Sequence, residues 1–199
     1  MDVLGLTFDE LCAARSPRAH DLKALRAAYR GLLSGTLDRP AEAPGGPLTA
    51  AVHPVVRHLA DGALTKFVQA TPDGLEIESV LVPMQRRGGQ WHTLCVSSQI
   101  GCARGCVFCE TAQLGLLRNL TAAEIVGQVV AAQRHFGVRV RNVVFMGMGE
   151  PLDNYTHVVQ AVRVLTDRGG LSFAQERVTI STVGRTAGIR RLATLGWRR

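Results

Sequence analysis

The chain has 199 residues, of which 46% are hydrophobic and 20% are charged, and its formal net charge is +7. This length suits one medium domain, or a small domain with part of a larger one, and the composition excludes wholesale disorder. No run of about 18 apolar residues occurs, so we expect no membrane partner. The acidic first ten residues carry no basic-then-apolar signal peptide, so we expect a cytoplasmic protein.

The net charge is unevenly distributed along the chain. Residues 1–101 carry ten basic and ten acidic side chains, whereas residues 102–199 carry thirteen basic and six acidic ones. All the basic residues except Lys23 and Lys66 are arginine, whose guanidinium group can bind two phosphate oxygens at once. A nucleic-acid partner is permitted by this excess, although the codon bias of a GC-rich genome would produce it as well.

Helix signals come first in the chain. Residues 7–10 (TFDE) have the spacing of a capping box, and Pro17 marks the start of a second helix. Residues 35–49 are rich in proline and glycine and predict a linker. Residues 1–60 are therefore expected to form a helical accessory region with a Pro/Gly-rich linker. The second helix should bury one apolar stripe: Leu22, Leu25, Tyr29 and Leu32 or Leu33.

A β-hairpin is expected between the accessory region and the rest of the chain. A short helical stretch is predicted around residues 55–59, and strands are predicted at 64–70 and 75–83. Thr71-Pro72-Asp73-Gly74 has the residues of a type I turn in their usual places. We therefore assign residues 61–91 to a hairpin that leads into the core.

Strands and helices alternate from residue 92 onward. This order predicts right-handed βαβ units and a parallel sheet, hence an α/β fold. Three parallel strands form an incomplete sheet with an open edge, so residues 92–199 are expected to be the front half of a larger core domain. The predicted strands are 93–97, 142–146 and 178–182, and the helices begin at Thr121, near Tyr155 and near Ala187.

The cysteines indicate metal or redox chemistry. Their number is odd and three lie within eight residues, which argues against a secreted disulfide framework. The C-x3-C-x2-C run fits a [4Fe–4S] cluster in which one iron stays open to a small molecule. The alternative is structural zinc with Cys95 or His92 as fourth ligand, but zinc ribbons usually show two C-x2-C pairs. The five cysteines are Cys12, Cys95, Cys102, Cys106 and Cys109.

Several ordered motifs between residues 76 and 190 resemble one family. The cysteine run, with the aromatic Phe108 just before its last cysteine, is similar to the signature of radical S-adenosylmethionine (SAM) enzymes. Further segments resemble the RlmN/Cfr family of RNA methyltransferases within that group. They are TLCVSSQIGC (93–102), TAQ (111–113), RNLT (118–121), EIVGQV (124–129), NVVFMGMGEPL (142–152) and RVTIST (177–182).

The resemblance implies a fold and an activity. The fold is the first half of a partial (β/α) barrel of the radical SAM type. The activity is methylation of carbon 2 of an adenine in 23S rRNA, with tRNA as a further substrate; Cfr-like members instead methylate carbon 8. Gly149-Glu150-Pro151 favours the RlmN side. A monomer served by a one-electron reductant such as flavodoxin or ferredoxin is expected.

Cofactor-binding residues follow from the same resemblance. Cys102, Cys106 and Cys109 would bind one [4Fe–4S] cluster, and SAM would chelate its open iron and be cleaved to a 5′-deoxyadenosyl radical. The SAM-binding residues would be Gly149, Glu150, Ser181 and Phe108. A carboxylate at position 150 suits the ammonium group of the methionine part. The alternative, a dinucleotide-type glycine loop, is weakened by Pro151 and the lack of a third glycine.

Two catalytic residues are expected by resemblance. Glu78 matches a general base that acts at the adenine carbon, with Glu76 on the same strand face as a rival. Cys95 matches the cysteine that resolves a covalent RNA adduct through a transient disulfide; the alternative is an ordinary buried thiol. Cys12 has no match, so we interpret it as a buried small residue.

The methyl-carrying partner of Cys95 is expected near the family's C-terminus. No cysteine follows Cys109, so we expect the chain to be C-terminally truncated. Two alternatives remain open at this point. One is a truncated or degenerate paralogue without methyltransferase turnover, and the other is a radical SAM enzyme of a different reaction.

Overall fold

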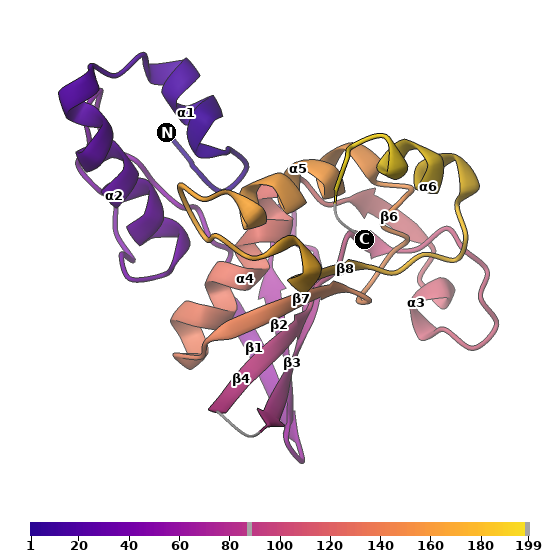
Figure 1. Ribbon diagram of the computed structural model, residues 1–199. Coiled ribbons are helices and arrows are strands. Elements are labelled where there is room, and N and C mark those ends of the chain that lie inside the picture. The colour runs from indigo at the N-terminus through magenta and orange to yellow at the C-terminus, as the bar shows by residue number, and fades with distance from the viewer. Residues whose placement is uncertain (87–88, 198–199) are drawn as a thin grey trace.

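The computed structural model describes residues 1–86 and 89–197 (Figure 1). Two N-terminal helices lead into a six-stranded sheet with the strand order β1-β2-β3-β4-β7-β8, and a two-stranded sheet pairs β5 with β6. The helices are α1 (Phe8–Arg15), α2 (Leu22–Leu33), α3 (Glu110–Gln113), α4 (Ala122–Phe136), α5 (Tyr155–Thr166) and α6 (Thr186–Ala193). The strands are β1 (Val55–Asp61), β2 (Leu64–Ala70), β3 (Glu76–Arg86), β4 (Gly89–Cys95), β5 (Gln99–Gly101), β6 (Leu116–Asn119), β7 (Val140–Phe145) and β8 (Val178–Ile180).

The accessory helices α1 and α2 share the apolar core of the rest of the chain, and the Asp167 carboxylate after α5 ties both helices to it. The predicted capping box begins α1, since the Thr7 hydroxyl accepts from the backbone of Glu10 and the Glu10 carboxylate accepts from that of Thr7. The Tyr29 hydroxyl on α2 donates to the carbonyl of Leu6 (2.7 Å) and to Asp167 after α5 (3.0 Å). Burial and the Asp167 charge raise the pKa of Tyr29, so this hydroxyl remains a donor.

The main sheet is antiparallel from β1 to β4 and parallel from β4 through β7 to β8. The helix predicted at residues 55–59 is wrong, because this segment is β1 and pairs with β2 from Val55↔Gln69 to Asp61↔Leu64. The predicted turn at residues 71–74 is confirmed: the Gly74 amide donates to the Thr71 carbonyl at 3.0 Å. The hairpin is therefore part of the same sheet as the later strands.

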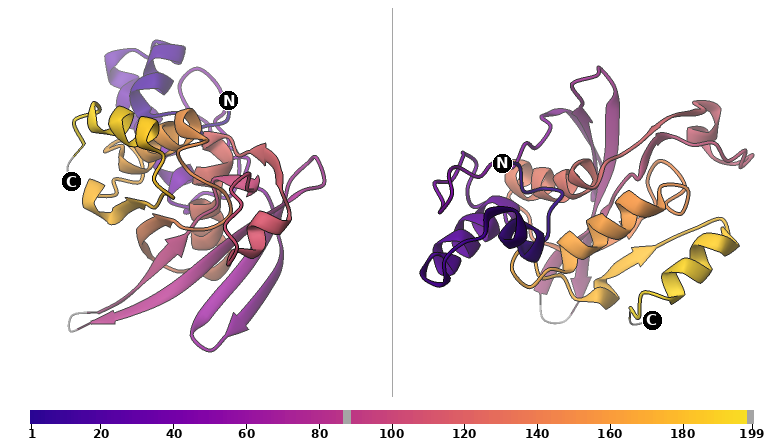
Figure 2. Two further views of the ribbon diagram at one scale, coloured as in Figure 1. Left: turned by 90° about the vertical axis from the view of Figure 1, so that its right-hand side faces the viewer. Right: turned by 90° about the horizontal axis from the view of Figure 1, so that it is seen from above.

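Helices cover one face of this sheet only. Gln128 on α4 is fully buried; its side-chain oxygen accepts from the Ser79 hydroxyl and the Ser97 amide, both at 2.8 Å. Residues of the opposite face, such as Glu78, Cys95 and Val144, are half-buried. We call this opposite side the uncovered face. Figure 2 shows the antiparallel strands projecting away from the helices.

The sheet is mixed and unclosed. Within the described residues, β1 and β8 form its two edges, and β8 is only three residues long. Across residues 1–86 and 89–197, none of the helices has the length and apolar character that a membrane span requires. The expected incomplete sheet is confirmed, and its parallel strands end at the same edge, where the segments that follow β4, β7 and β8 begin.

Candidate functional site

A pocket of about 240 Å³ lies at the carboxyl ends of the parallel strands. Ligands of open α/β sheets bind at this edge, because the loops that follow neighbouring strands meet there. The pocket is formed by the cysteine loop (102–111), the loop after β7 (146–151) and the loop after β8 (181–183). It gathers seven residues to which the sequence assigned cofactor binding: Cys102, Cys106, Phe108, Cys109, Gly149, Glu150 and Ser181.

The cysteine loop is closed at its base by the small β5–β6 sheet. The Cys102 amide donates to the carbonyl of Gly115 at 2.8 Å. A side chain at Gly101, which has a φ of +76°, would place its Cβ 1.8 Å from the same carbonyl oxygen. Only glycine fits this approach. Neither short strand was predicted, because each is defined by pairing with the other.

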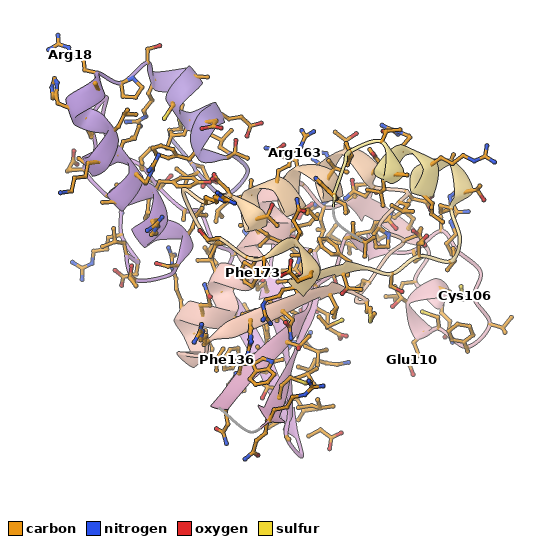
Figure 3. All side chains as sticks on the ribbon, viewed as in Figure 1. Arg18, Cys106, Glu110, Phe136, Arg163 and Phe173 are labelled. Atoms are coloured by element: carbon orange, nitrogen blue, oxygen red, sulfur yellow. The ribbon has the colours of Figure 1, made fainter. Side chains whose placement is uncertain are left out.

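The three cysteines differ in exposure. Cys102 is 9% exposed, while Cys106 and Cys109 are half-buried on the outlying loop that carries the Cys106 label in Figure 3. Phe108 is 89% exposed, so its ring stands at the pocket rim and contributes little packing. The loop therefore presents its thiols to the pocket from one side.

The cysteine arrangement bears on which metal centre fits. Among the described residues, no three His, Cys, Asp or Glu side chains gather closely enough to hold a single metal ion. A structural zinc ion needs four ligands converging on one point, whereas a [4Fe–4S] cluster takes one thiolate per iron and so spreads its ligands apart. The three cysteines all line one pocket, which is the arrangement that one thiolate per iron requires.

Two glycines let the loop after β7 approach the segment after β4. A Cβ on Gly147 would lie 2.9 Å from the Ser97 backbone nitrogen, and one on Gly149 would lie 2.5 Å from the Cβ of Gln99. Gly149 also has a φ of +97°, which favours glycine. These glycines are needed for close packing beside the pocket.

The carboxylate of Glu150 joins two pocket loops. It is 2% exposed and accepts hydrogen bonds from the Leu152 amide (2.9 Å), the Thr182 hydroxyl (2.8 Å) and the Val183 amide (2.8 Å). A carboxylate offers about four acceptor positions, so one position stays available for a ligand. Thr182 and Val183 lie beside Ser181, so Glu150 also fixes the start of the loop after β8.

An ion-pair bridge that the sequence did not predict joins all three loops. Asp153 accepts from Nε of Arg104 in the cysteine loop at 2.7 Å and lies 2.8 Å from Nε of Arg185 after β8. Arg104 also lines the pocket between two of the cysteines. No spacing rule reveals this bridge, because Arg104 and Asp153 are 49 residues apart.

A second network anchors the outer side of the cysteine loop. Arg118 on β6 donates to Asp73 in the β2–β3 turn (2.6 Å) and to Glu124 at the start of α4 (2.8 Å). Burial alone would raise the pKa of Glu124, but hydrogen bonds from Arg118 and Thr121 outweigh it and leave that pKa below its ordinary value. The network ties β6 to the β2–β3 turn and to the start of α4.

Glu78 and Cys95 lie outside the pocket, on the uncovered face of the sheet. Their strands pair at Val80↔Cys95, and Glu78 forms an ion pair with Lys66 at 3.1 Å. Burial raises the pKa of the Cys95 thiol; a backbone hydrogen bond from Met146 lowers it, and the Glu78 charge raises it further. The rival Glu76 is exposed and paired with Arg57, and it is the Glu78 charge that contributes to the raised pKa of Cys95.

Comparisons with known proteins agree on one family. The model of the radical SAM superfamily matches residues 96–199. A probable dual-specificity RNA methyltransferase RlmN 1 of Protochlamydia amoebophila is 53% identical, covering 70% of this chain and 38% of that protein. A dual-specificity RNA methyltransferase RlmN of Nitratidesulfovibrio vulgaris (Miyazaki F) is 40% identical, covering 98% of this chain and 59% of that protein.

A solved structure shares the fold. The crystal structure of a radical SAM methyltransferase from Sphaerobacter thermophilus matches with a TM-score of 0.79 and 34% identity, covering 100% of this chain and 61% of that one. The chain thus spans less than two thirds of each relative described.

Proposed function

Because this chain belongs to the radical SAM superfamily and is a homologue of the RlmN RNA methyltransferases, we propose that it provides the cluster and SAM site of an adenine carbon-2 methyltransferase acting on 23S rRNA and tRNA. One observation carries the proposal: the three clustered cysteines, Glu150 and Ser181 line a single pocket at the carboxyl ends of parallel strands. The reaction draws electrons from a flavodoxin- or ferredoxin-like reductant.

The architecture we propose is the first half of a partial (β/α) barrel. Residues 1–60 form the accessory region, 61–91 the hairpin that leads into the core and 92–199 the front of the barrel. The unclosed edge at β8 and the single helix-covered face support this division, since a barrel wall is covered by helices on its outside only.

Cys102, Cys106 and Cys109 would hold one [4Fe–4S] cluster. Their position around one pocket supports this. The close approach of Gly101 to the Gly115 carbonyl, which fixes the base of their loop, supports it as well. When bound and reduced, the cluster supplies the electron that cleaves SAM to a 5′-deoxyadenosyl radical. Arg104 and its bridge to Asp153 hold the loop against the rest of the pocket.

Gly149, Glu150 and Ser181 would receive SAM, with Phe108 shielding the rim. The acceptor position left on Glu150 suits an ammonium group, and its buried carboxylate keeps the two loops at a fixed separation. Glu78 would accept the proton from the adenine carbon, and Cys95 would resolve the RNA adduct. Their position on the uncovered face, linked to the pocket through Met146, supports these roles.

Anaerobic reconstitution with iron and sulfide tests this proposal. We expect about four irons and four sulfides per chain, an electron paramagnetic resonance signal that shifts when SAM is added, and 5′-deoxyadenosine after reduction. Cys106→Ala should lose the signal and the cleavage, whereas Cys12→Ala, outside the pocket, should retain both. No cysteine follows Cys109 in these 199 residues, so SAM cleavage is a sharper readout than methyl transfer.

Three results would contradict the proposal. Finding one zinc ion and no sulfide per chain would rule out the [4Fe–4S] cluster. Equal iron loss in the Cys106→Ala and Cys12→Ala variants would rule out the cysteine loop as the place where iron binds. Labelled methyl groups at carbon 8 of adenine would show that the reaction is the Cfr-like one and not methylation of carbon 2.

A further inference from the structure

We propose that a basic hollow at the amino ends of the parallel strands, opposite to the carboxyl ends where the pocket lies, binds phosphates of the RNA backbone, away from the reacting base. We call it the arginine basin. It has a volume of about 790 Å³ and is lined by Arg30, Arg139, Arg141 and Arg177, with Ser34, Gln133 and Phe173 among the other lining residues. The inference rests on the proposed function, because it takes the substrate to be RNA.

The basin lies at the amino ends of the parallel strands. Arg139 directly precedes β7 and Arg177 directly precedes β8, whereas the cofactor pocket lies where these strands end. Six residues of β7 at about 3.3 Å each put the two sites roughly 20 Å apart. The basin therefore cannot hold the reacting base or SAM, and an RNA must extend along the side of the sheet to reach it.

The charge of the basin is not neutralised locally. Within the described part of the chain, no carboxylate lies within ion-pair distance of these four guanidinium groups. Arg30 donates to the carbonyl of Arg168 (2.9 Å), Arg177 donates to the side-chain oxygen of Asn142 (3.2 Å), and Arg141 stacks over Trp91 at 4.5 Å. The nearby carboxylate of Asp167 is already occupied by Tyr29 and by two backbone amides.

Four arginines around one open hollow favour an extended polyanion. Guanidinium groups bind phosphate oxygens in pairs, and an RNA backbone offers such oxygens at every nucleotide. Arg30 comes from the accessory helix α2, while the other three arginines come from the core. RNA held here would contact both parts of the chain, and the accessory region would contribute directly to substrate binding.

Binding of a labelled RNA stem-loop with an unpaired adenosine tests the basin. The variant R30E/R139E reverses two exposed side chains, and R18E/R39E is the matched control. Arg18 lies at the far end of the accessory helices from Phe173, which lines the basin (Figure 3). Affinity is measured by fluorescence anisotropy between about 50 and 200 mM salt, since each lost phosphate contact lowers the salt slope by about one.

We expect R30E/R139E to bind the RNA at least about tenfold more weakly and to lose about two from the salt slope, while R18E/R39E keeps both. If RNA affinity fell equally in both variants, or in neither, the assignment of RNA binding to the arginine basin would be overturned. Inorganic tripolyphosphate is a second probe of the same variants. If R30E/R139E bound tripolyphosphate more weakly but bound RNA with unchanged affinity, RNA would be ruled out as the ligand of the basin. SAM cleavage by the wild-type chain, measured in the same preparation, reports the proposed function separately.

Discussion

Glu150 shows how one side chain serves both the architecture and the chemistry of the pocket. Its carboxylate is buried and accepts three hydrogen bonds, two of them from backbone amides. A buried carboxylate is retained only when such donors compensate its lost hydration. The same carboxylate lines the pocket, where we propose that it receives the ammonium group of SAM.

Replacing Glu150 with glutamine should destabilise the fold. The amide group would point an N–H donor at either the Leu152 or the Val183 amide, leaving a buried donor unsatisfied. We expect a loss of about 1–3 kcal/mol in the free energy of unfolding in urea. Glu42→Gln, an exposed matched change, should cost less than about 0.5 kcal/mol. Equal stability of the two variants would contradict the role assigned to Glu150.

The Cys95 thiol is predicted to react in a way that depends on Glu78. Its pKa is raised by burial and by the Glu78 charge, so removing that charge should lower the pKa and enlarge the thiolate fraction. We expect Glu78→Gln to speed alkylation of Cys95 about twofold at mildly alkaline pH, measured by peptide mass spectrometry. Glu76→Gln, on the same strand, should leave the rate unchanged. A response to Glu76 instead of Glu78 would reverse their assignment.

At the scale of elements, strands and helix starts with local signals could be predicted from the sequence. The contacts between the loops that form the pocket could not. Strand β2 occupies residues 64–70 as predicted, and the capping box at Thr121 begins α4 because its signals are local. Strand β1 was missed because its hydrogen bonds come from β2, and β5 and β6 were missed for the same reason. The Asp153 bridge depends on how three loops meet, which no local pattern encodes.

The Arg118 network should make stability depend on pH. The pKa of Glu124 lies below its ordinary value of 4.5, so its stabilising contribution is complete above that value and is lost as the pH falls through the lower, folded-state pKa. We expect the urea midpoint of the wild-type chain to fall below about pH 4.5 and Glu124→Gln to remove part of this fall. Glu10→Gln changes the other capping box, whose carboxylate accepts from Thr7 and Gln160 and not from a guanidinium group in the described residues, and it should remove less of this fall. An unchanged pH profile in Glu124→Gln would contradict the network.

At the scale of the whole molecule, the sheet carries an edge that can pair with another chain. Strand β8 pairs with β7 on one side, and its middle residue, Thr179, is exposed. Edge strands without a charge or a cover promote association between chains.

Placing a lysine at position 179 should reduce this association. We expect Thr179→Lys to raise the concentration at which the chain self-associates in sedimentation velocity, because a charge on an edge strand opposes pairing with a second edge. Thr156→Lys adds the same charge to an exposed position near the start of α5 and should have a smaller effect. Identical sedimentation of the two variants would show that β8 is not the associating edge.

Strand β4 has neighbours of two kinds, and this sets an order of assembly. It pairs with β3 across a short hairpin, but its pairing with β7 joins residues as far apart as Thr93 and Asn142. Distant pairs form later because closing the intervening loop costs more chain entropy. We therefore expect the β1–β4 meander to form before the parallel strands, and the pocket, which needs the loops after β7 and β8, to be completed last. The pocket is therefore the part of the sheet whose formation depends on every earlier pairing.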